Sequence, residues 1–355
     1  MMTMRAAVYR EFGGPLLVEE LAVPRAPPLG VVLRVKATGV CRSDWHGWKG
    51  HDSDIVDHGL PFVPGHELSG IVHEVGEGVE TLKVGQRVAC PFILSCGACR
   101  ECARGRATIC ERQEQPGFTM HGSFAEYVKI PRAERNLCVL PEAVSFVEAA
   151  ALGCRTTTAF RAIVQRGRLE AGETVAVFGC GGLGLSAVLC ALAVGARVIA
   201  VDVSEAARAK ATSLGAIAAV DASLGAEETR RAILALTEDG IGADVAVDAA
   251  GFAATCEAAC WCVRRGGRVV QVGLPLGAGS APSVPMARVA NREIEIVGSH
   301  GLDAADMPRV LQLVAAGTLR VRELIGAEVS LEEGARALEA MDGASPLGIT
   351  VITSF

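Results

Sequence analysis

The sequence predicts an α/β fold in which a doubly wound parallel sheet is joined to a β-rich region. From residue 174 onward, short apolar strands alternate with segments of helical length, a pattern typical of a parallel sheet covered by helices. The first 150 residues instead hold short β-branched runs separated by Gly and Pro, which favour strands and turns. Half of the chain is hydrophobic but only 4% is aromatic, so the predicted core is aliphatic.

The expected elements follow this division. In the β-rich region we expect strands at 31–35, 68–75 and 87–89 and no long helix between residues 16 and 139. Helices are expected next, at 145–151 and 156–164. The alternating region then has strands at 174–178, 197–201, 218–220, 244–248, 268–272 and 293–297, with helices at 182–194, 205–214, 227–236 and 253–262. The C-terminal part is expected to hold helices at 307–316 and 331–341 and a strand at 348–353.

Charge and hydropathy exclude several classes of partner. The net charge is −6 and no basic run occurs, so nucleic acid is not an expected partner. The first 14 residues contain no apolar stretch of signal-peptide length. The apolar strands are also far too short to cross a membrane. We therefore expect a cytoplasmic protein with no membrane partner.

Four of the thirteen cysteines form a cluster in one loop. Cys96, Cys99, Cys102 and Cys110 follow the pattern C-x2-C-x2-C-x7-C. Four thiolates so close together can complete a tetrahedral shell, which is typical of a structural zinc site with no open position. The residues between them are polar, so the metal is expected to organise the loop. Chance clustering, a redox pair and an iron–sulfur cluster are weaker alternatives.

A glycine-rich turn follows the first strand of the alternating region. Residues 179–184 read G-C-G-G-L-G and open a helix, as in the turn that binds the pyrophosphate of a dinucleotide. The helix N-terminus there offers free N–H groups to phosphates. The alternative is a glycine-rich turn without a ligand. The expected contacts are Gly179, Gly181, Gly182, Leu183 and Gly184.

An acidic residue at the end of the next strand bears on the choice of dinucleotide. Asp202 lies 18 residues after the last glycine, where a carboxylate accepts hydrogen bonds from the ribose hydroxyls and repels a 2′-phosphate. This position favours NAD over NADP. Asp202 could instead cap the following helix, although Ser204 fits that role at least as well. Arg208 lies nearby and could weaken the preference for NAD.

Three further segments contain possible metal ligands. They are G-V-C-R-S-D-W-H at 39–46, P-G-H-E at 64–67 and L-G-C-R-T-T-T at 152–158. Each is weak alone, because a single His or Cys is more often structural. Together with the cysteine loop and the glycine-rich turn, in this order, they resemble the zinc-containing medium-chain dehydrogenase/reductase family, in particular its alcohol dehydrogenases. The resemblance is collinear over essentially the whole chain.

The resemblance implies a second, catalytic zinc. Its ligands would be Cys41, His66 and Cys154, with the fourth position open to substrate. In some members an acid replaces the third ligand, and Glu148 and Glu67 are the acidic alternatives here. Glu67 is otherwise expected beside the zinc, sometimes as a transient ligand. The resemblance also assigns Asp44 as the carboxylate that holds the His66 ring.

The resemblance further implies how protons, cofactor and substrate are handled. Ser43 would take the substrate proton and His46 would pass it to solvent. Zinc lowers the pKa of an alcohol and polarises a carbonyl. The remaining expected contacts are Arg42 on the pyrophosphate, Thr158 on the nicotinamide, Gly273 on the cofactor, and Trp45, Phe92 and Phe124, with Trp48 in addition, in the substrate pocket.

The domain organisation and assembly also follow from the resemblance. It implies a GroES-like catalytic domain from residues 1–152 and 300–355 and a Rossmann NAD-binding domain from 153–299. The segment between Cys110 and Phe124 is short, which in this family goes with tetramers more than with dimers. A homotetramer is therefore expected, with a dimer as the alternative.

The expected function is hydride transfer between a primary or secondary alcohol and NAD, with two zinc ions per chain. A polyol or hydroxyacyl dehydrogenase on the same scaffold is the second enzymatic hypothesis, although the aromatic pocket residues favour an apolar substrate. A non-catalytic nucleotide-binding protein is the third. That hypothesis predicts a damaged catalytic set, whereas the expected ligands and relay residues are all present.

Overall fold

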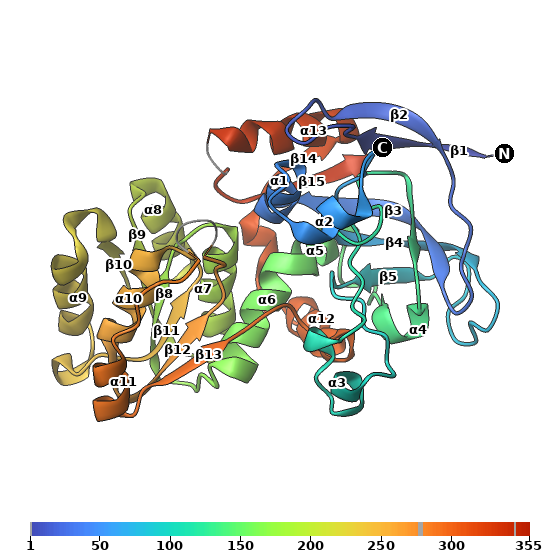
Figure 1. The fold of residues 1–355 in the computed structure, drawn as a ribbon. Helices are drawn as coiled ribbons and strands as arrows, with labels where there is room; N and C mark the ends of the chain where they lie inside the picture. The colour runs from blue at the N-terminus through green and yellow to red at the C-terminus, as the bar shows by residue number, and fades with distance from the viewer. Residues whose placement is uncertain (1, 276–279, 344–345) are drawn as a thin grey trace. The chain divides into compact units, whose positions relative to one another are not determined.

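The computed structural model describes residues 2–275, 280–343 and 346–355. The chain forms two compact units, one from residues 1–157 and 301–355 and the other from residues 158–300 (Figure 1). The first unit thus runs past residue 152, the predicted limit of the β-rich domain. None of the helices in the described residues combines the length and the apolar character needed to cross a membrane.

The first unit is built on a seven-stranded sheet in which β15 pairs antiparallel with β3. The C-terminal segment is therefore part of the same sheet as the N-terminal strands. The predicted strands near residues 31, 68, 87 and 348 are present. Five other strands of this unit, two to six residues long, were missed because they lack a continuous β-branched run. The sheet strands are β14 (Ile325–Ser330), β15 (Ile349–Ser354), β3 (Val31–Val40), β4 (Glu67–Val75), β5 (Arg87–Cys90), β7 (Cys138–Val139) and β6 (Tyr127–Ile130), and a separate hairpin holds β1 (Thr3–Val8) and β2 (Leu17–Ala22).

Helices of the first unit are short before residue 139, as expected. Sequence analysis nevertheless missed α1 (Arg42–Trp48), which carries most of the first motif. Its first turn is stabilised by Asp44, whose carboxylate accepts a hydrogen bond from the backbone N–H of Cys41 at the N-cap. The other helices are α2 (Ser53–His58), α3 (Arg100–Ala103), α4 (Ala133–Asn136), α5 (Phe146–Ala151), α12 (Met307–Ala315) and α13 (Leu331–Glu339).

A π-helical turn at Leu152–Thr156 follows α5 directly. It is followed by α6 (Thr157–Phe160) and a second π-helical turn, Arg161–Arg166. The sequence predicted two ordinary helices here. π-Helical turns are rare and are often found at functional sites, and the first one contains Cys154.

The second unit is a six-stranded parallel sheet with the order β10-β9-β8-β11-β12-β13. This is the order of a doubly wound dinucleotide-binding sheet, so the predicted fold class is confirmed. The strands are β8 (Thr174–Phe178), β9 (Arg197–Asp202), β10 (Ala218–Asp221), β11 (Ala243–Asp248), β12 (Val263–Gln271) and β13 (Glu295–Gly298). The helices are α7 (Gly182–Val194), α8 (Glu205–Leu214), α9 (Ala226–Ala235), α10 (Ala253–Cys262) and α11 (Met286–Arg292), of which only α11 was not predicted.

The central strands of this sheet are runs of consecutive hydrophobic residues, because both of their faces are buried in an aliphatic core. The strand β8 is buried along its whole length, as expected for a central strand with helices on both faces. Its carboxyl end leads into the glycine-rich turn, and the carboxyl end of its neighbour β9 holds Asp202. The topology therefore brings the two predicted parts of the dinucleotide site to one edge of the sheet.

Candidate active site and metal centres

Antiparallel pairing of β3 with β4 assembles the centre of a buried cluster. Gly39 near the end of β3 lies opposite Glu67 at the start of β4. Cys41 follows the first strand and His66 precedes the second, so pairing brings them together. Cys154 comes from the π-helical turn. The ligand atoms of Cys41, His66, Glu67 and Cys154 all lie within 4.8 Å of one another.

Two glycines allow these segments to approach closely. A Cβ on Gly39 would lie 2.1 Å from Oε2 of Glu67, and one on Gly153 would lie 2.6 Å from Cα of Glu67. Neither distance leaves room for a side chain. The glycines that precede Cys41 and Cys154 in their motifs are therefore needed for packing around Glu67.

Asp44 orients the histidine of the cluster. Its Oδ1 accepts hydrogen bonds from Nδ1 of His66 at 2.8 Å and from the backbone N–H of Gly65 at 3.0 Å. The expected contact between Asp44 and His66 is therefore present. In the neutral ring, the hydrogen bond to Asp44 places the proton on Nδ1 and leaves the lone pair on Nε2, a buried atom that has no hydrogen-bond partner among the described residues.

Glu67 forms a buried ion pair with Arg155, a contact that the sequence analysis missed. Nε of Arg155 donates to Oε1 of Glu67 at 2.9 Å, and Nη2 contacts Oε2. Nη2 also donates to the carbonyl of Val40 at 3.0 Å. Glu67 is fully buried and Arg155 nearly so. The available signal was that Arg155 directly follows a predicted ligand and is the only charged residue between Glu148 and Arg161.

The charges of the cluster shift the pKa values of its members. A hydrogen bond from the thiol of Cys154 lowers the pKa of Cys41 well below its usual value, and the charge of Arg155 acts in the same direction. The same hydrogen bond and burial raise the pKa of Cys154. Burial disfavours a charged His66, but the charge and hydrogen bond of Asp44 outweigh it and raise the pKa of His66.

This donor set fits a catalytic zinc. Two cysteine sulfurs and one imidazole nitrogen with an unpartnered lone pair match the Cys₂His set of open zinc sites. Both oxygens of Glu67 are engaged by Arg155. The carboxylate of Glu148 accepts hydrogen bonds from Ser145 at the start of α5, which gives it a capping role instead of a ligand role. The residues present would therefore hold the metal with Cys41, His66 and Cys154.

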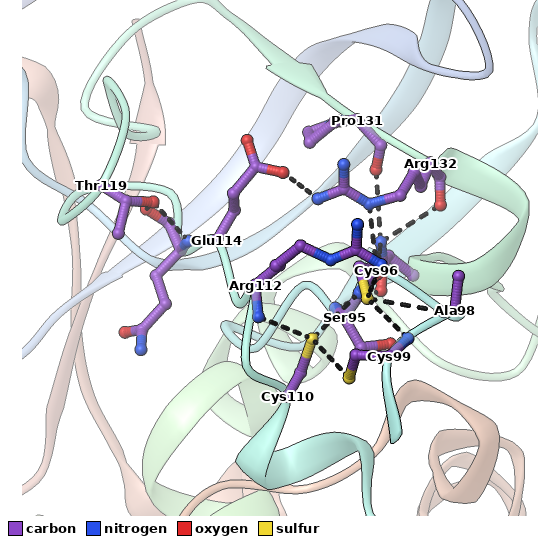
Figure 2. Close-up of polar contacts among 12 residues, drawn as sticks. Ser95, Cys96, Ala98, Cys99, Cys110, Arg112, Glu114, Thr119, Pro131 and Arg132 are labelled. Carbon is purple, nitrogen blue, oxygen red and sulfur yellow. Dashed lines mark hydrogen bonds and ion pairs between the residues drawn. The ribbon is translucent and has the colours of Figure 1, made fainter. Parts of the chain in front are cut away.

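The four-cysteine loop forms the second cluster, and Figure 2 shows three of its members, Cys96, Cys99 and Cys110. The sulfurs of Cys96 and Cys102 are 4.0 Å apart and those of Cys99 and Cys110 are 3.8 Å apart. A tetrahedral zinc with bonds of about 2.3 Å requires ligand sulfurs about 3.8 Å apart. The four thiolates therefore fit a zinc ion that has no open position.

Backbone and side-chain donors surround these sulfurs. The Cys96 sulfur accepts from the N–H groups of Ala98 and Cys99 at 3.4 and 3.3 Å and from Nη2 of Arg112 at 3.5 Å (Figure 2). The hydrogen bond from Ala98 is the largest of the effects that lower the pKa of Cys96 to about 6. Since a thiolate is the form that binds zinc, this cysteine is ready to bind the metal at neutral pH.

The glycine-rich turn in the second unit has the geometry of a phosphate cradle. A Cβ on Gly184 would lie 1.7 Å from the carbonyl oxygen of Gly179, so the helix packs tightly against the strand. A Cβ on Gly181 would meet nothing within 4 Å, so the space above this residue is open. Gly182 and Leu183 begin α7, and no side chain caps the N-terminus of this helix. Its first N–H groups can therefore donate to a phosphate. The turn therefore fits a dinucleotide pyrophosphate.

Asp202 supports the turn from the neighbouring strand. Its Oδ2 accepts a hydrogen bond from the backbone N–H of Cys180 at 2.6 Å, and its Oδ1 accepts one from Ser204 at 2.7 Å. Ser204 caps α8, as expected. The guanidinium of Arg208 is held by the carbonyl of Asp202 and by Asp221, which restricts its reach towards a 2′-phosphate.

The other predicted residues of α1 lie around its exposed face. Ser43 is half-buried in the first turn. Nδ1 of His46 lies 3.2 Å from Nδ1 of His51, a pairing that was not expected. The guanidinium of Arg42 lies 3.6 Å from the centre of the Trp45 ring, and the indole N–H of Trp45 donates to Asp342 at 2.8 Å.

The aromatic residues divide into two groups. The ring centres of Phe92 and Phe118 lie 6.0 and 5.0 Å from that of His66, so Phe118 joins Phe92 beside the cluster although sequence analysis did not select it. Phe124 and Trp48 belong to a hydrophobic core cluster of the first unit that also contains Phe118. The indole N–H of Trp48 donates to the carbonyl of Gly14 at 2.7 Å, and the expected places of Trp48 and Phe124 in the substrate pocket stay predictions.

Two predicted cofactor contacts lie in the second unit. The hydroxyl of Thr158 is buried and has no hydrogen-bond partner among the described residues. Gly273 follows β12, and a Cβ there would lie 2.4 Å from the backbone nitrogen of Gly251. The close approach of these two loops explains the glycine.

Known proteins share both parts of this architecture. Residues 27–142 match the family described as alcohol dehydrogenase GroES-like domain, and residues 182–316 match the zinc-binding dehydrogenase family. An alcohol dehydrogenase of Geobacillus stearothermophilus is 36% identical over 89% of this chain and 90% of its own length. A probable D-xylulose reductase A of Emericella nidulans is 33% identical over 90% of this chain and 89% of its own length.

A solved structure extends the comparison to three dimensions. A protein described as an NAD-dependent alcohol dehydrogenase superposes with a TM-score of 0.87 at 32% identity, covering 99% of this chain and all of its own. The relatives and the two metal-ligand clusters point to the same conclusion: the chain belongs to the zinc-containing medium-chain dehydrogenase/reductase family of oxidoreductases.

Proposed function

We propose that the protein transfers a hydride between a primary or secondary alcohol and NAD, with one catalytic and one structural zinc ion per chain. The observation that carries the proposal is the largely buried set of Cys41, His66 and Cys154, in which Nε2 of His66 has no hydrogen-bond partner among the described residues. When bound, zinc would supply Lewis-acid polarisation of the substrate oxygen.

The residues around the ligands keep this site in one geometry. Asp44 fixes the ring of His66 through Nδ1 and thereby directs Nε2 into the cluster. Arg155 holds Glu67 next to the ligands and compensates its buried charge. Glu67 and Asp44 therefore act as positioning residues in this proposal.

Ser43 and His46 would carry the substrate proton outwards. The hydroxyl of Ser43 makes no hydrogen bond to another described residue and is free to accept a proton from a substrate hydroxyl. Burial, followed by the positive charges of Arg42 and His51, lowers the pKa of His46. His46 is thus neutral at pH 7 and can accept a proton, with His51 at its outer side.

The nucleotide would be bound by the second unit. Gly179, Gly181, Gly182, Leu183 and Gly184 would cradle the pyrophosphate. Asp202 would select NAD, because a second negative charge beside it is repelled. The similar structure described as NAD-dependent supports the same choice. Thr158 and Gly273 would contact the cofactor.

The substrate is an apolar or aromatic alcohol in this proposal. The rings of Phe92 and Phe118 lie beside that of His66. The relative named a D-xylulose reductase makes a polyol the second candidate. Polyol binding needs several hydrogen-bonding groups around the substrate, whereas the rings beside His66 are apolar.

The remaining assignments concern domains and assembly. The first unit acts as the catalytic domain and the second as the NAD-binding domain. The short segment between Cys110 and Phe124 supports a homotetramer, and sedimentation analysis of the zinc-loaded protein separates a tetramer from a dimer. The cytoplasm is the proposed compartment.

A substrate panel tests the central proposal. The purified protein is given NAD or NADP with small, branched and aromatic alcohols and with polyols, each with and without a zinc chelator. We expect chelator-sensitive reduction of NAD, and faster turnover of apolar alcohols than of polyols. Turnover that is independent of metal would contradict the mechanism. A preference for polyols would move the assignment to the second candidate.

A further inference from the structure

Five arginines line one depression at the edge of the second unit. The depression has a volume of about 380 Å³ and lies between α9, α10, α11 and the start of β12. Trp261 forms part of its wall. The arginines are Arg230, Arg264, Arg265, Arg288 and Arg292.

This depression is separate from the glycine-rich turn. Ile241 lies just before β11, and Arg264 and Arg265 lie at the start of β12. The glycine-rich turn follows the carboxyl end of β8, which runs parallel to β11. The arginines therefore lie at the amino-terminal edge of the sheet, opposite to the edge with the predicted cofactor site.

The positive charge of this cluster is only partly compensated. Arg230 pairs with Glu227 at 3.2 Å and Arg264 with Asp244 at 2.6 Å. Within the described residues, no carboxylate lies within ion-pair distance of Arg265, Arg288 or Arg292. Three like charges thus share the wall of one depression and give it a positive potential that attracts anions.

Two of the guanidinium groups are already fixed in position. Arg288 donates to the backbone carbonyls of Cys260, Trp261 and Val263 at 2.9 to 3.1 Å, and it lies 5.0 Å from the Trp261 ring centre. Nη1 of Arg230 donates to both carboxylate oxygens of Glu227 at 3.2 Å. Guanidinium groups that are already held in place lose little entropy on binding an anion.

We propose that this arginine cluster binds a phosphate group, either as free phosphate or as part of a phosphorylated small molecule. A tetrahedral dianion accepts several charge-assisted hydrogen bonds at once, as planar guanidinium groups provide. The proposal does not depend on the assigned reaction, because its residues lie outside the proposed active site.

Calorimetry on the zinc-loaded protein with saturating NADH tests the site, since NADH occupies the glycine-rich turn. Inorganic phosphate and glycerol 3-phosphate are titrated separately at constant ionic strength. We expect saturable binding of inorganic phosphate, of glycerol 3-phosphate or of both. The probe that binds more tightly shows whether the site takes free phosphate or a phosphorylated small molecule. The double variant Arg265→Gln/Arg292→Gln should bind at least about tenfold more weakly, because charge-assisted hydrogen bonds are lost.

Arg197→Gln is the matched control. Arg197 is an exposed arginine at the start of β9, on the same edge of the sheet but outside the depression. The Arg197→Gln variant should bind phosphate as tightly as the unchanged protein does. Thermal unfolding with and without phosphate shows whether each variant is folded. Binding that is absent, does not saturate or is equally weakened in both variants overturns the proposal.

Discussion

The two metal-ligand clusters of the first unit are built in opposite ways. Cys96, Cys99, Cys102 and Cys110 lie in a single loop, and local turns bring their sulfurs together. Cys41, His66 and Cys154 are far apart in the sequence and meet only because β3 pairs with β4 and the π-helical turn packs against them. A closed structural site can therefore be encoded locally, whereas the open site depends on the whole unit.

The clusters also differ in how charge is compensated. The four-cysteine loop is near solvent and uses backbone N–H groups and the exposed Arg112. The other cluster is buried and uses the carboxylate of Asp44 and the Glu67–Arg155 ion pair. Since buried charges cost far more when unpaired, substitutions around the buried cluster should have larger effects.

The largest expected effect is the loss of turnover on Cys41→Ser. Removing this ligand should lower kcat about a thousandfold, since Lewis-acid catalysis contributes several kcal/mol. Metal analysis should show one zinc per chain instead of two, with NADH binding retained. Cys138→Ser removes a half-buried thiol outside both clusters and should retain activity. Full activity of Cys41→Ser would refute its role as a ligand.

The next effect concerns the ion pair beside the buried cluster. Arg155→Met leaves Glu67 buried without a partner and should lower the free energy of unfolding by about 3 to 5 kcal/mol. Adding Glu67→Gln should restore part of this loss in denaturant unfolding. The control Arg10→Met breaks an exposed ion pair with Glu19 and should cost less than about 1 kcal/mol. If Arg155→Met and Arg10→Met lowered the free energy of unfolding equally, the buried ion pair would not differ from an exposed one.

Substitution in the four-cysteine loop should affect stability more than chemistry. Cys99→Ser should release the structural zinc and lower Tm by about 10 °C, as expected when a loop loses its metal. The value of kcat at 25 °C should stay within about twofold. If kcat instead fell as far as in Cys41→Ser, the division into a catalytic and a structural site would be wrong.

The smallest effect is expected at Arg112. Arg112→Gln removes an exposed donor to the Cys96 sulfur and should speed zinc release to a chromogenic chelator about threefold, since exposed charge pairs are worth less than about 1 kcal/mol. Arg104→Gln, an exposed arginine in the same loop, should release zinc at the original rate. If both variants released zinc at the same rate, Arg112 would have no role in holding the metal.

Sequence analysis performed best where the signal was local. The parallel strands and their helices were predicted from hydrophobic runs, and β8, α7, α8 and α10 have the predicted limits. The helix α1 was missed because only seven residues form it and its residues were interpreted as a motif. The strands β1, β2 and β14 were missed because some of their residues are exposed and they contain no run of β-branched residues.

The site shows the same limit. Spacing alone indicated the four-cysteine loop and the glycine-rich turn, since their function depends on neighbouring residues. Trp48 illustrates the opposite case, because a ring beside the motif in sequence points into the core. Phe118 and His51 were found only in three dimensions, through their contacts with His66 and His46.

The sequence by itself determined the fold class, the closed metal loop and the dinucleotide turn, because strand hydrophobicity, cysteine spacing and glycine positions act over short distances. Only the tertiary structure decided that Arg155 neutralises Glu67, that Nε2 of His66 has no hydrogen-bond partner among the described residues, and that five arginines share one depression. These features depend on which side chains meet after distant segments have packed, and charge compensation in a buried site is settled only by those contacts.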